Sequence, residues 1–179
     1  YRTTQGICAA ALDTLKGVEP DALDVENGSG AGEQYRSLRA GERPRELTFA
    51  TPEEESDFIA KAIVGTPARP FLVLARTRSM LKAIHGRLKT RGVATSMLAD
   101  SEVMPSGNQV VLATLHRSKG LEAPHVILAG MQESPMRFPG GSDTEKDLWQ
   151  RKERLLRYVG MTRARDTCDV TRVNKEPRR

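Results

Sequence analysis

The sequence lacks several features that would place it in particular classes of protein. No run of about 18 apolar residues, the length that a membrane-spanning helix needs, occurs in it, and its start has no signal-peptide pattern. Aromatic residues make up only 4% of the 179 residues, whereas 38% are hydrophobic and 28% are charged, as in soluble globular domains. This length suffices for one domain with a sizeable core. Because the chain begins with Tyr rather than Met, we expect it to be a piece of a longer polypeptide.

Cysteine and histidine are also scarce, and neither is spaced for a metal site. Cys8 and Cys168 lie far apart in apolar surroundings, which predicts two reduced, buried thiols in a cytoplasmic protein. The histidines, His85, His116 and His125, do not have the spacing of zinc ligands. We therefore predict no metal site.

Charge is unevenly distributed along the chain. Residues 13–57 contain 12 acidic and 5 basic residues, whereas residues 151–179 contain 10 basic and 4 acidic residues. A basic segment at one end favours an anionic partner. For the basic tail at residues 174–179, a solvated surface without a partner is an equally good explanation.

Helix and strand patterns alternate from end to end. Helices are predicted at residues 4–16, 51–64, 79–91 and from 143 onward, and strands at 46–50, 71–75, 93–98, 110–113, 123–128 and 167–173. Residues 17–45, which mix acidic residues with Gly and Pro, predict a long exposed loop. Thr51 and Pro52 have the pattern of an N-cap followed by a proline at the first helical position. The alternation predicts βαβ units in an α/β domain with a largely parallel sheet.

In the last predicted helix, four apolar residues are spaced to face the core. They are Leu148, Leu155, Leu156 and Val159.

The segment at residues 110–128 is the most informative, and its sequence is VVLATLHRSKGLEAPHVIL. Two apolar runs flank a polar loop from Thr114 to Glu122, a pattern typical of neighbouring buried parallel strands. Ligand sites in open α/β sheets lie beyond the carboxyl ends of the strands. We therefore expect the chemistry to lie in the loop after Ala113, at that end of the sheet.

A second segment, residues 153–165, has the sequence ERLLRYVGMTRAR. Together the two segments resemble motifs V and VI of UvrD/Rep-type superfamily-one DNA helicases, whose patterns are close to T-x-H-x-x-K-G-L-E and E-x-R-x-x-Y-V-x-x-T-R-A. The opening YRTT resembles the end of motif IV, N-Y-R-S/T. The resemblance implies the C-terminal RecA-like domain of such a helicase, a three-layer α/β domain. Only 34 residues, 76–109, stand where the family carries an inserted domain, so we expect no accessory inserted domain.

The resemblance also implies a nucleotide site. Arg163 and Arg2 match the arginines that reach the γ-phosphate, Tyr1 matches the tyrosine that stacks on adenine, and Glu122 matches the glutamate that hydrogen-bonds the ribose. Gly120 would let the backbone approach the nucleotide closely. Without the motifs, each arginine would be read as an ordinary surface ion-pair former, the terminus as frayed and the glutamate as a loop carboxylate.

Four further residues match family positions along the single-stranded DNA. Thr114 and His116 would meet the DNA and couple it to the nucleotide site, Arg76 would lie near its track, and Lys119 would add charge unless it is merely solvated. Hydroxyl and cationic groups of this kind bind phosphates without reading sequence. Ala123 replaces the aromatic residue that the family has after G-L-E, so packing under this loop must come from elsewhere.

The resemblance implies the C-terminal motor domain of an ATP-dependent DNA helicase, and the family usually moves 3′ to 5′. The chain has no G-x-x-x-x-G-K-[S/T] loop, so we expect the N-terminal RecA-like domain of the same polypeptide to hold most of the ATP and Mg²⁺ and the isolated chain to be inactive. The alternative is an ATP-driven module that binds and remodels RNA polymerase, which the acidic loop favours. The basic segment favours DNA, and repair proteins are further candidate partners. A degenerate scaffold domain is disfavoured by the intact motifs.

Overall fold

The computed structural model describes residues 3–16, 37, 39–66, 70–98, 110–131 and 140–174. Several sequence predictions lie outside the described residues: those for Tyr1 and Arg2, for most of the 17–45 loop, for the loops after residues 98 and 131, and for the end of the basic tail.

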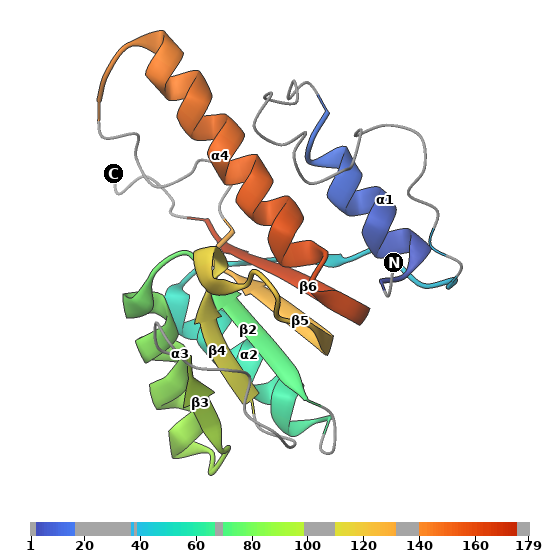
Figure 1. The fold of residues 1–179 in the computed structure, drawn as a ribbon. Helices are drawn as coiled ribbons and strands as arrows, with labels where there is room; N and C mark the ends of the chain where they lie inside the picture. Colours follow the sequence, from blue (N-terminus) through green and yellow to red (C-terminus); the bar gives the residue numbers. More distant parts are fainter. Residues whose placement is uncertain are drawn as a thin grey trace.

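A single sheet of six strands forms the centre of the domain, and every pair of neighbouring strands is parallel (Figure 1). The elements in chain order are α1 (Gln5–Asp13), β1 (Arg45–Phe49), α2 (Pro52–Val64), β2 (Phe71–Ala75), α3 (Arg78–Thr90), β3 (Thr95–Met97), β4 (Val110–Thr114), the 3₁₀-helix η2 (Leu115–Arg117), β5 (Ala123–Ala129), α4 (Asp143–Met161) and β6 (Ala164–Val173). The strand order across the sheet is β1-β6-β5-β2-β4-β3.

Helices cover both faces of this sheet. α1 and α4 pack on one face, and α2 and α3 pack on the other (Figure 1). The first face buries Ile7 and Met161 against the sheet, whereas the second buries Ile59 and Ile84. All five residues of β2 are buried because the strand has a helical layer on each side. The predicted three-layer RecA-like α/β fold is confirmed.

Local signals explain where two of the helices begin. The Thr51 hydroxyl accepts a hydrogen bond from the Glu54 N–H, and Pro52 occupies the first helical position, as predicted. α4 begins with a capping box in which Ser142 and Glu145 bind each other's backbone N–H groups. This bond from the Ser142 N–H lowers the pKa of the Glu145 carboxyl below its usual value.

Two predictions about this part of the chain were wrong. Leu148 is exposed, because the first half of α4 extends past the strands and has no sheet beneath it (Figure 1). β6 begins at Ala164, three residues before the predicted start, because Ala164 already pairs with Ala123 of β5.

The two cysteines are free and buried, as predicted. Burial raises the pKa of the Cys168 thiol far above its usual value, and the neighbouring carboxylate of Asp169 raises it further. None of the described helices is long and apolar enough to span a membrane.

Candidate nucleotide and nucleic-acid sites

The structure divides the candidate residues between two opposite edges of the sheet. Arg76 follows β2, Thr114 ends β4, and His116 lies in η2 directly after it, so these three lie at the carboxyl edge. Glu122 directly precedes β5 and Arg163 directly precedes β6, so these two lie at the amino edge. The loop after Ala113, where we expected the chemistry at the carboxyl edge, begins at that edge with Thr114 and His116, whereas Glu122 at the end of the same loop lies at the opposite edge.

At the carboxyl edge, Arg76 is held by a carboxylate of α4. Its Nε donates to both carboxylate oxygens of Glu153, at 2.9 and 3.2 Å, and its Nη2 lies 2.8 Å from Glu153 Oε1. Its Nη1 faces the ring of His116, 3.4 Å from Nδ1 and 3.5 Å from Nε2. The side chain of Arg76 is 25% exposed and that of Glu153 is 16% exposed, so the pair is largely shielded from water.

The loop between β4 and β5 connects the two edges and has a defined internal structure. Ser118 is fully buried, and its hydroxyl donates to the Leu115 carbonyl at 2.7 Å, while its own carbonyl accepts from the Leu121 N–H at 3.0 Å. Gly120 has φ of +83°, a conformation that favours glycine. Lys119 is exposed at the same turn.

Two residues at these sites were missed in the sequence. Ser118 is flanked by charged residues, and that context does not distinguish a buried hydroxyl from an exposed one. Glu153 opens the second motif, and its spacing of ten residues before Arg163 on a predicted helix was the available signal. The contact that reveals its role joins residues 77 positions apart.

At the amino edge, the described residues that hold Arg163 do so through neutral oxygen atoms. Its Nε donates to the Val159 carbonyl at 3.0 Å, and its Nη2 donates to the Thr162 hydroxyl at 3.2 Å. No carboxylate of the described residues lies within ion-pair distance of this guanidinium, which is partly exposed. Arg163 therefore keeps an uncompensated positive charge at this edge.

Backbone contacts bring other parts of the chain to the same edge. The Ala123 N–H, next to Glu122, donates to the Arg163 carbonyl at 3.1 Å. The Gln5 N–H, at the start of α1, donates to the carbonyl of Arg39, which also forms an ion pair with Asp166 at 2.7 Å near the start of β6. The start of α1, which follows the first residues of the chain, is thus tied to the strand that begins after Arg163.

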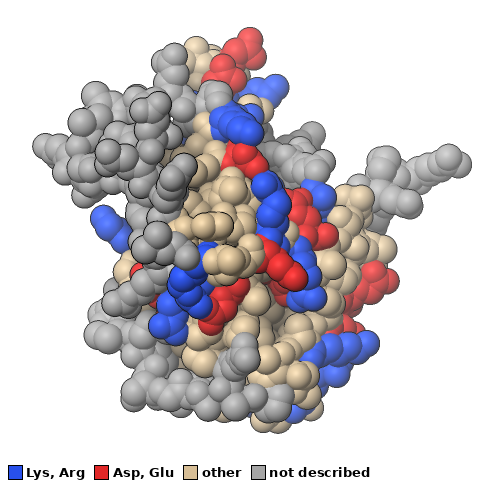
Figure 2. Space-filling view, turned by 90° about the vertical axis from the view of Figure 1, so that its right-hand side faces the viewer, with Lys and Arg blue, Asp and Glu red and all other residues tan. Residues whose placement is uncertain are grey.

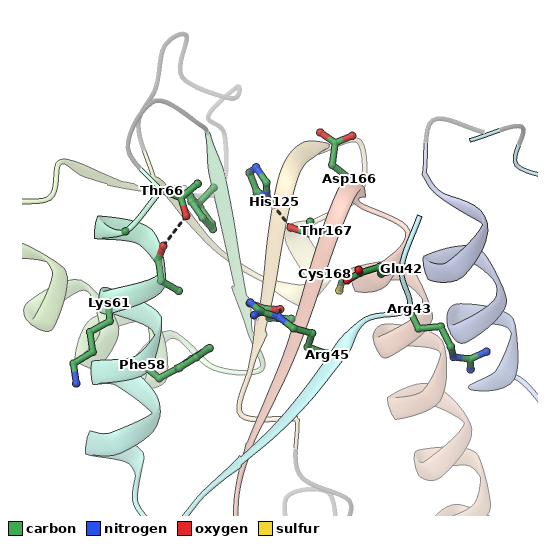
Figure 3. A pocket seen from close by; sticks show the side chains of 14 residues that line it. Glu42, Arg43, Arg45, Phe58, Lys61, Thr66, His125, Asp166, Thr167 and Cys168 are labelled. Carbon is green, nitrogen blue, oxygen red and sulfur yellow. Dashed lines mark hydrogen bonds and ion pairs between the residues drawn. The ribbon is translucent and has the colours of Figure 1, made fainter. Parts of the chain in front are cut away.

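A hollow of about 530 Å³ also opens at the amino ends of β5 and β6, beside α2 (Figure 3). Arg45 in its wall makes two hydrogen bonds of 2.7 Å to the Asp169 carboxylate, and they raise the pKa of Arg45. His125 Nδ1 lies 2.6 Å from the Thr167 hydroxyl. None of the predicted site residues that the structure describes lies among those that line the hollow, and the Arg45–Asp169 pair neutralises two of its charges.

The acidic and basic parts of the sequence meet in the fold. Glu46 of β1 binds Arg157 of α4 at 2.7 Å and lies 3.5 Å from Arg172 of β6. Figure 2 shows Lys and Arg side chains beside Asp and Glu side chains on one face of the molecule, rather than a continuous basic patch among the coloured residues. Part of the basic charge after residue 151 is therefore neutralised within the domain.

Comparisons with known proteins relate part of this chain to one family. Residues 94–174 match the family model of the UvrD-like helicase C-terminal domain. Proteins described as "ATP-dependent DNA helicase PcrA" from Staphylococcus aureus (strain Mu50) and Staphylococcus epidermidis (strain ATCC 12228) are each 37% identical over 76 residues, 42% of this chain. The chain spans about a tenth of the length of these relatives, since the match covers 10% of each.

A solved structure extends the comparison to the whole fold. The C-terminal domain of a possible DNA helicase from Lactobacillus plantarum WCFS1 superposes with a TM-score of 0.67 and covers 98% of this chain and 88% of that one. At 17% identity this likeness shows the fold alone. Thr114, Glu122 and Arg163 lie within the segment that the family model matches, whereas Arg76 lies before it.

Proposed function

We propose that this chain, which carries a UvrD-like helicase C-terminal domain at residues 94–174, is the second RecA-like motor domain of an ATP-dependent DNA helicase. The observation that carries this proposal is the state of Arg163, a partly exposed arginine that binds neutral oxygens, and no carboxylate of the described residues, at the edge where Glu122 also lies. Such a guanidinium is available for an anion that a second domain presents.

Hydrolysis of a terminal phosphate depends mainly on placing cations against the phosphoryl oxygens as charge develops on them. Arg163 leaves the Val159 carbonyl and the Thr162 hydroxyl to bind the γ-phosphate, for which its planar fork is suited. Arg2 adds a second charge, and Tyr1 stacks on the base. These two residues precede the α1 start that is tied to this edge.

The remaining nucleotide contacts come from the turn before β5. Glu122 is exposed there and accepts a hydrogen bond from the ribose. The open backbone conformation at Gly120 allows close approach. ATP and Mg²⁺ are held mainly by the N-terminal RecA-like domain of the same polypeptide, because this chain has no phosphate-cradling loop.

Single-stranded DNA is the proposed partner of the carboxyl edge. Thr114 and His116 contact its sugar–phosphate backbone. The Arg76 guanidinium faces the His116 ring and holds it in place, and Lys119 adds positive charge in the same loop. Contacts of this kind fix the position of the strand without reading its sequence. Translocation runs 3′ to 5′ as the cleft between the two RecA-like domains closes and opens.

The test is ATP hydrolysis by the complete polypeptide with and without single-stranded DNA, together with strand separation of a duplex that carries a 3′ single-stranded tail. We expect hydrolysis that DNA stimulates, and unwinding that requires ATP. The isolated chain should fold and should not hydrolyse ATP. A complete polypeptide whose hydrolysis ignores DNA, or an isolated chain that hydrolyses ATP, would contradict the proposal.

A second candidate is an ATP-driven module that remodels RNA polymerase. The observation in its favour is the acidic composition of residues 17–36, which contain five acidic residues and one basic residue. Such a module would contact protein more than DNA, and repair proteins are alternative partners of the same kind. Binding of the complete polypeptide to RNA polymerase without duplex unwinding would favour this candidate.

A further inference from the structure

One ion pair at the carboxyl edge joins the elements that carry the two proposed sites. Arg76 at the end of β2 binds Glu153 through three contacts of 2.8 to 3.2 Å and faces His116 through its remaining nitrogen. The carboxylate lies on α4, and α4 leads directly into the turn that contains Arg163. The DNA-side residues and the nucleotide-side arginine are therefore linked through one helix.

The geometry of α4 suits this role. Glu153 lies eight positions before the end of α4 at Met161, about 12 Å at the rise of an α-helix, and Arg163 follows two residues later, so this part of α4 runs from the carboxyl edge towards the amino edge. Its last turn packs directly on the DNA-side loop. A Cβ at Gly160 would lie 2.7 Å from Leu115 Cδ2 and 2.8 Å from Leu128 Cδ2, so glycine permits this close approach.

We propose that Glu153 is a positioning residue that transmits DNA binding at His116 and Arg76 to Arg163 through α4. The proposal rests on the proposed function and adds a residue that the sequence motifs had not assigned to either site. Glu153 touches neither DNA nor nucleotide in this account. It fixes the direction of the Arg76 guanidinium, and a shift of Arg76 on DNA binding moves α4 with it.

The Arg76–Glu153 pair is shielded from water and makes several contacts, and both properties suit it to transmit a movement of Arg76 to α4. An exposed ion pair is loose and contributes little, whereas a shielded, forked arginine–carboxylate contact has one preferred geometry. The Arg76 side chain is 25% exposed and that of Glu153 is 16% exposed. Replacing the carboxylate with an amide keeps the size of the side chain but removes the charge that orients Arg76.

The test uses the complete polypeptide with Glu153→Gln and measures ATP hydrolysis without DNA and over a range of single-stranded DNA concentrations. We expect the DNA-free rate to stay at the wild-type level and the maximal DNA-stimulated rate to fall about tenfold, within the range of coupling between binding sites. Asp147→Asn is the matched control, because Asp147 is an exposed acid on the same helix. It should leave both rates unchanged.

A double-variant cycle separates coupling from a merely structural role. Arg76→Gln and the Arg76→Gln/Glu153→Gln double variant should show the same loss of maximal stimulation, because the two residues act as a unit. Losses that multiply in the double variant, or a Glu153→Gln enzyme that is less heat-stable but fully stimulated by DNA, would overturn the proposal. If the wild-type polypeptide itself shows no stimulation by DNA, the proposed function fails instead.

Discussion

The carboxyl and amino edges of the sheet each carry an arginine that family motifs single out, yet the two side chains are in opposite states. Arg76 is shielded and bound to the carboxylate of Glu153, whereas Arg163, within the part of the chain that the structure describes, binds a carbonyl and a hydroxyl but no carboxylate. A neutralised arginine can orient its neighbours but has little charge to offer. An uncompensated one retains its charge for a phosphate.

This difference changes how the two arginines are interpreted. In the sequence, both match a family position, Arg163 that of an arginine that reaches the γ-phosphate and Arg76 that of a residue near the DNA track, but the sequence does not show what neutralises either charge. In the fold, Arg76 faces His116 and pairs with Glu153, whereas Arg163 has no carboxylate partner among the described residues. The predictions below test whether the two edges differ in this way.

Among the expected effects on DNA binding and on stability, the largest is at the carboxyl edge. In the complete polypeptide, Thr114→Ala with His116→Ala should weaken single-stranded DNA binding by at least about tenfold, because each lost hydrogen bond to a phosphate is charge-assisted. Fluorescence anisotropy with a labelled oligonucleotide measures this loss. Deletion of residues 174–179 is the control and should cost little affinity.

The dependence of this DNA binding on salt concentration further tests whether the protein contacts DNA phosphates. Each phosphate that a cationic side chain neutralises adds a slope of about −0.7 in a plot of log affinity against log salt on single strands, so binding by the complete polypeptide should weaken steeply as salt rises. The assignment would be contradicted by the reverse ranking, in which deleting the tail abolishes binding and the double variant binds normally.

The contact of the last turn of α4 with Leu115 and Leu128 should be sensitive to a single added methyl group. Gly160→Ala should destabilise the domain by about 1–3 kcal/mol, because the new Cβ would overlap the side chains of Leu115 and Leu128. Gly86→Ala is the matched control in α3, where nothing lies within 4 Å of the added Cβ. It should stabilise the helix by about 0.5–1 kcal/mol. Thermal unfolding compares the two, and equal shifts would show that α4 does not pack on the loop as closely as described.

Cys168, in the strand that runs between the edges, should show the smallest effect. Its pKa is raised, so the native thiol stays protonated at pH values where the unfolded thiol ionises. Stability is therefore lost as pH rises through the ordinary thiol range. In a Cys8→Ala background, iodoacetamide at pH 8.5 should label the protein slowly when native and rapidly in denaturant. Fast labelling of the native protein would show that β6 is more open than described.

Most of the fold could be predicted from the sequence, because periodicity and capping residues are local signals. Thr51 and Pro52 predicted the start of α2, and the apolar run at 71–75 predicted β2 within the bounds observed. Periodicity does not reveal where a sheet ends beneath a helix, which is why Leu148 was expected in the core.

The site was predictable in its residues but not in its arrangement. Motif spacing named Thr114, Glu122 and Arg163, yet it did not reveal that they divide between two edges. That division follows from which end of a parallel strand each residue adjoins, since Thr114 ends β4 whereas Glu122 and Arg163 precede β5 and β6. The Arg76–Glu153 pair depends on a contact across 77 residues, which leaves no local pattern.

We propose that Arg163 binds the γ-phosphate of ATP, and ATP hydrolysis by the Arg163→Ala variant is the measurement that decides this. In the complete polypeptide with saturating single-stranded DNA, we expect kcat to fall by about 10³-fold or more, as when an arginine finger is lost. Arg163→Lys should recover little, because a point charge does not reproduce the planar fork. Arg154→Ala, an exposed arginine on the same helix, should behave as wild type. An Arg163→Ala enzyme that hydrolyses ATP at close to the wild-type rate would contradict the account.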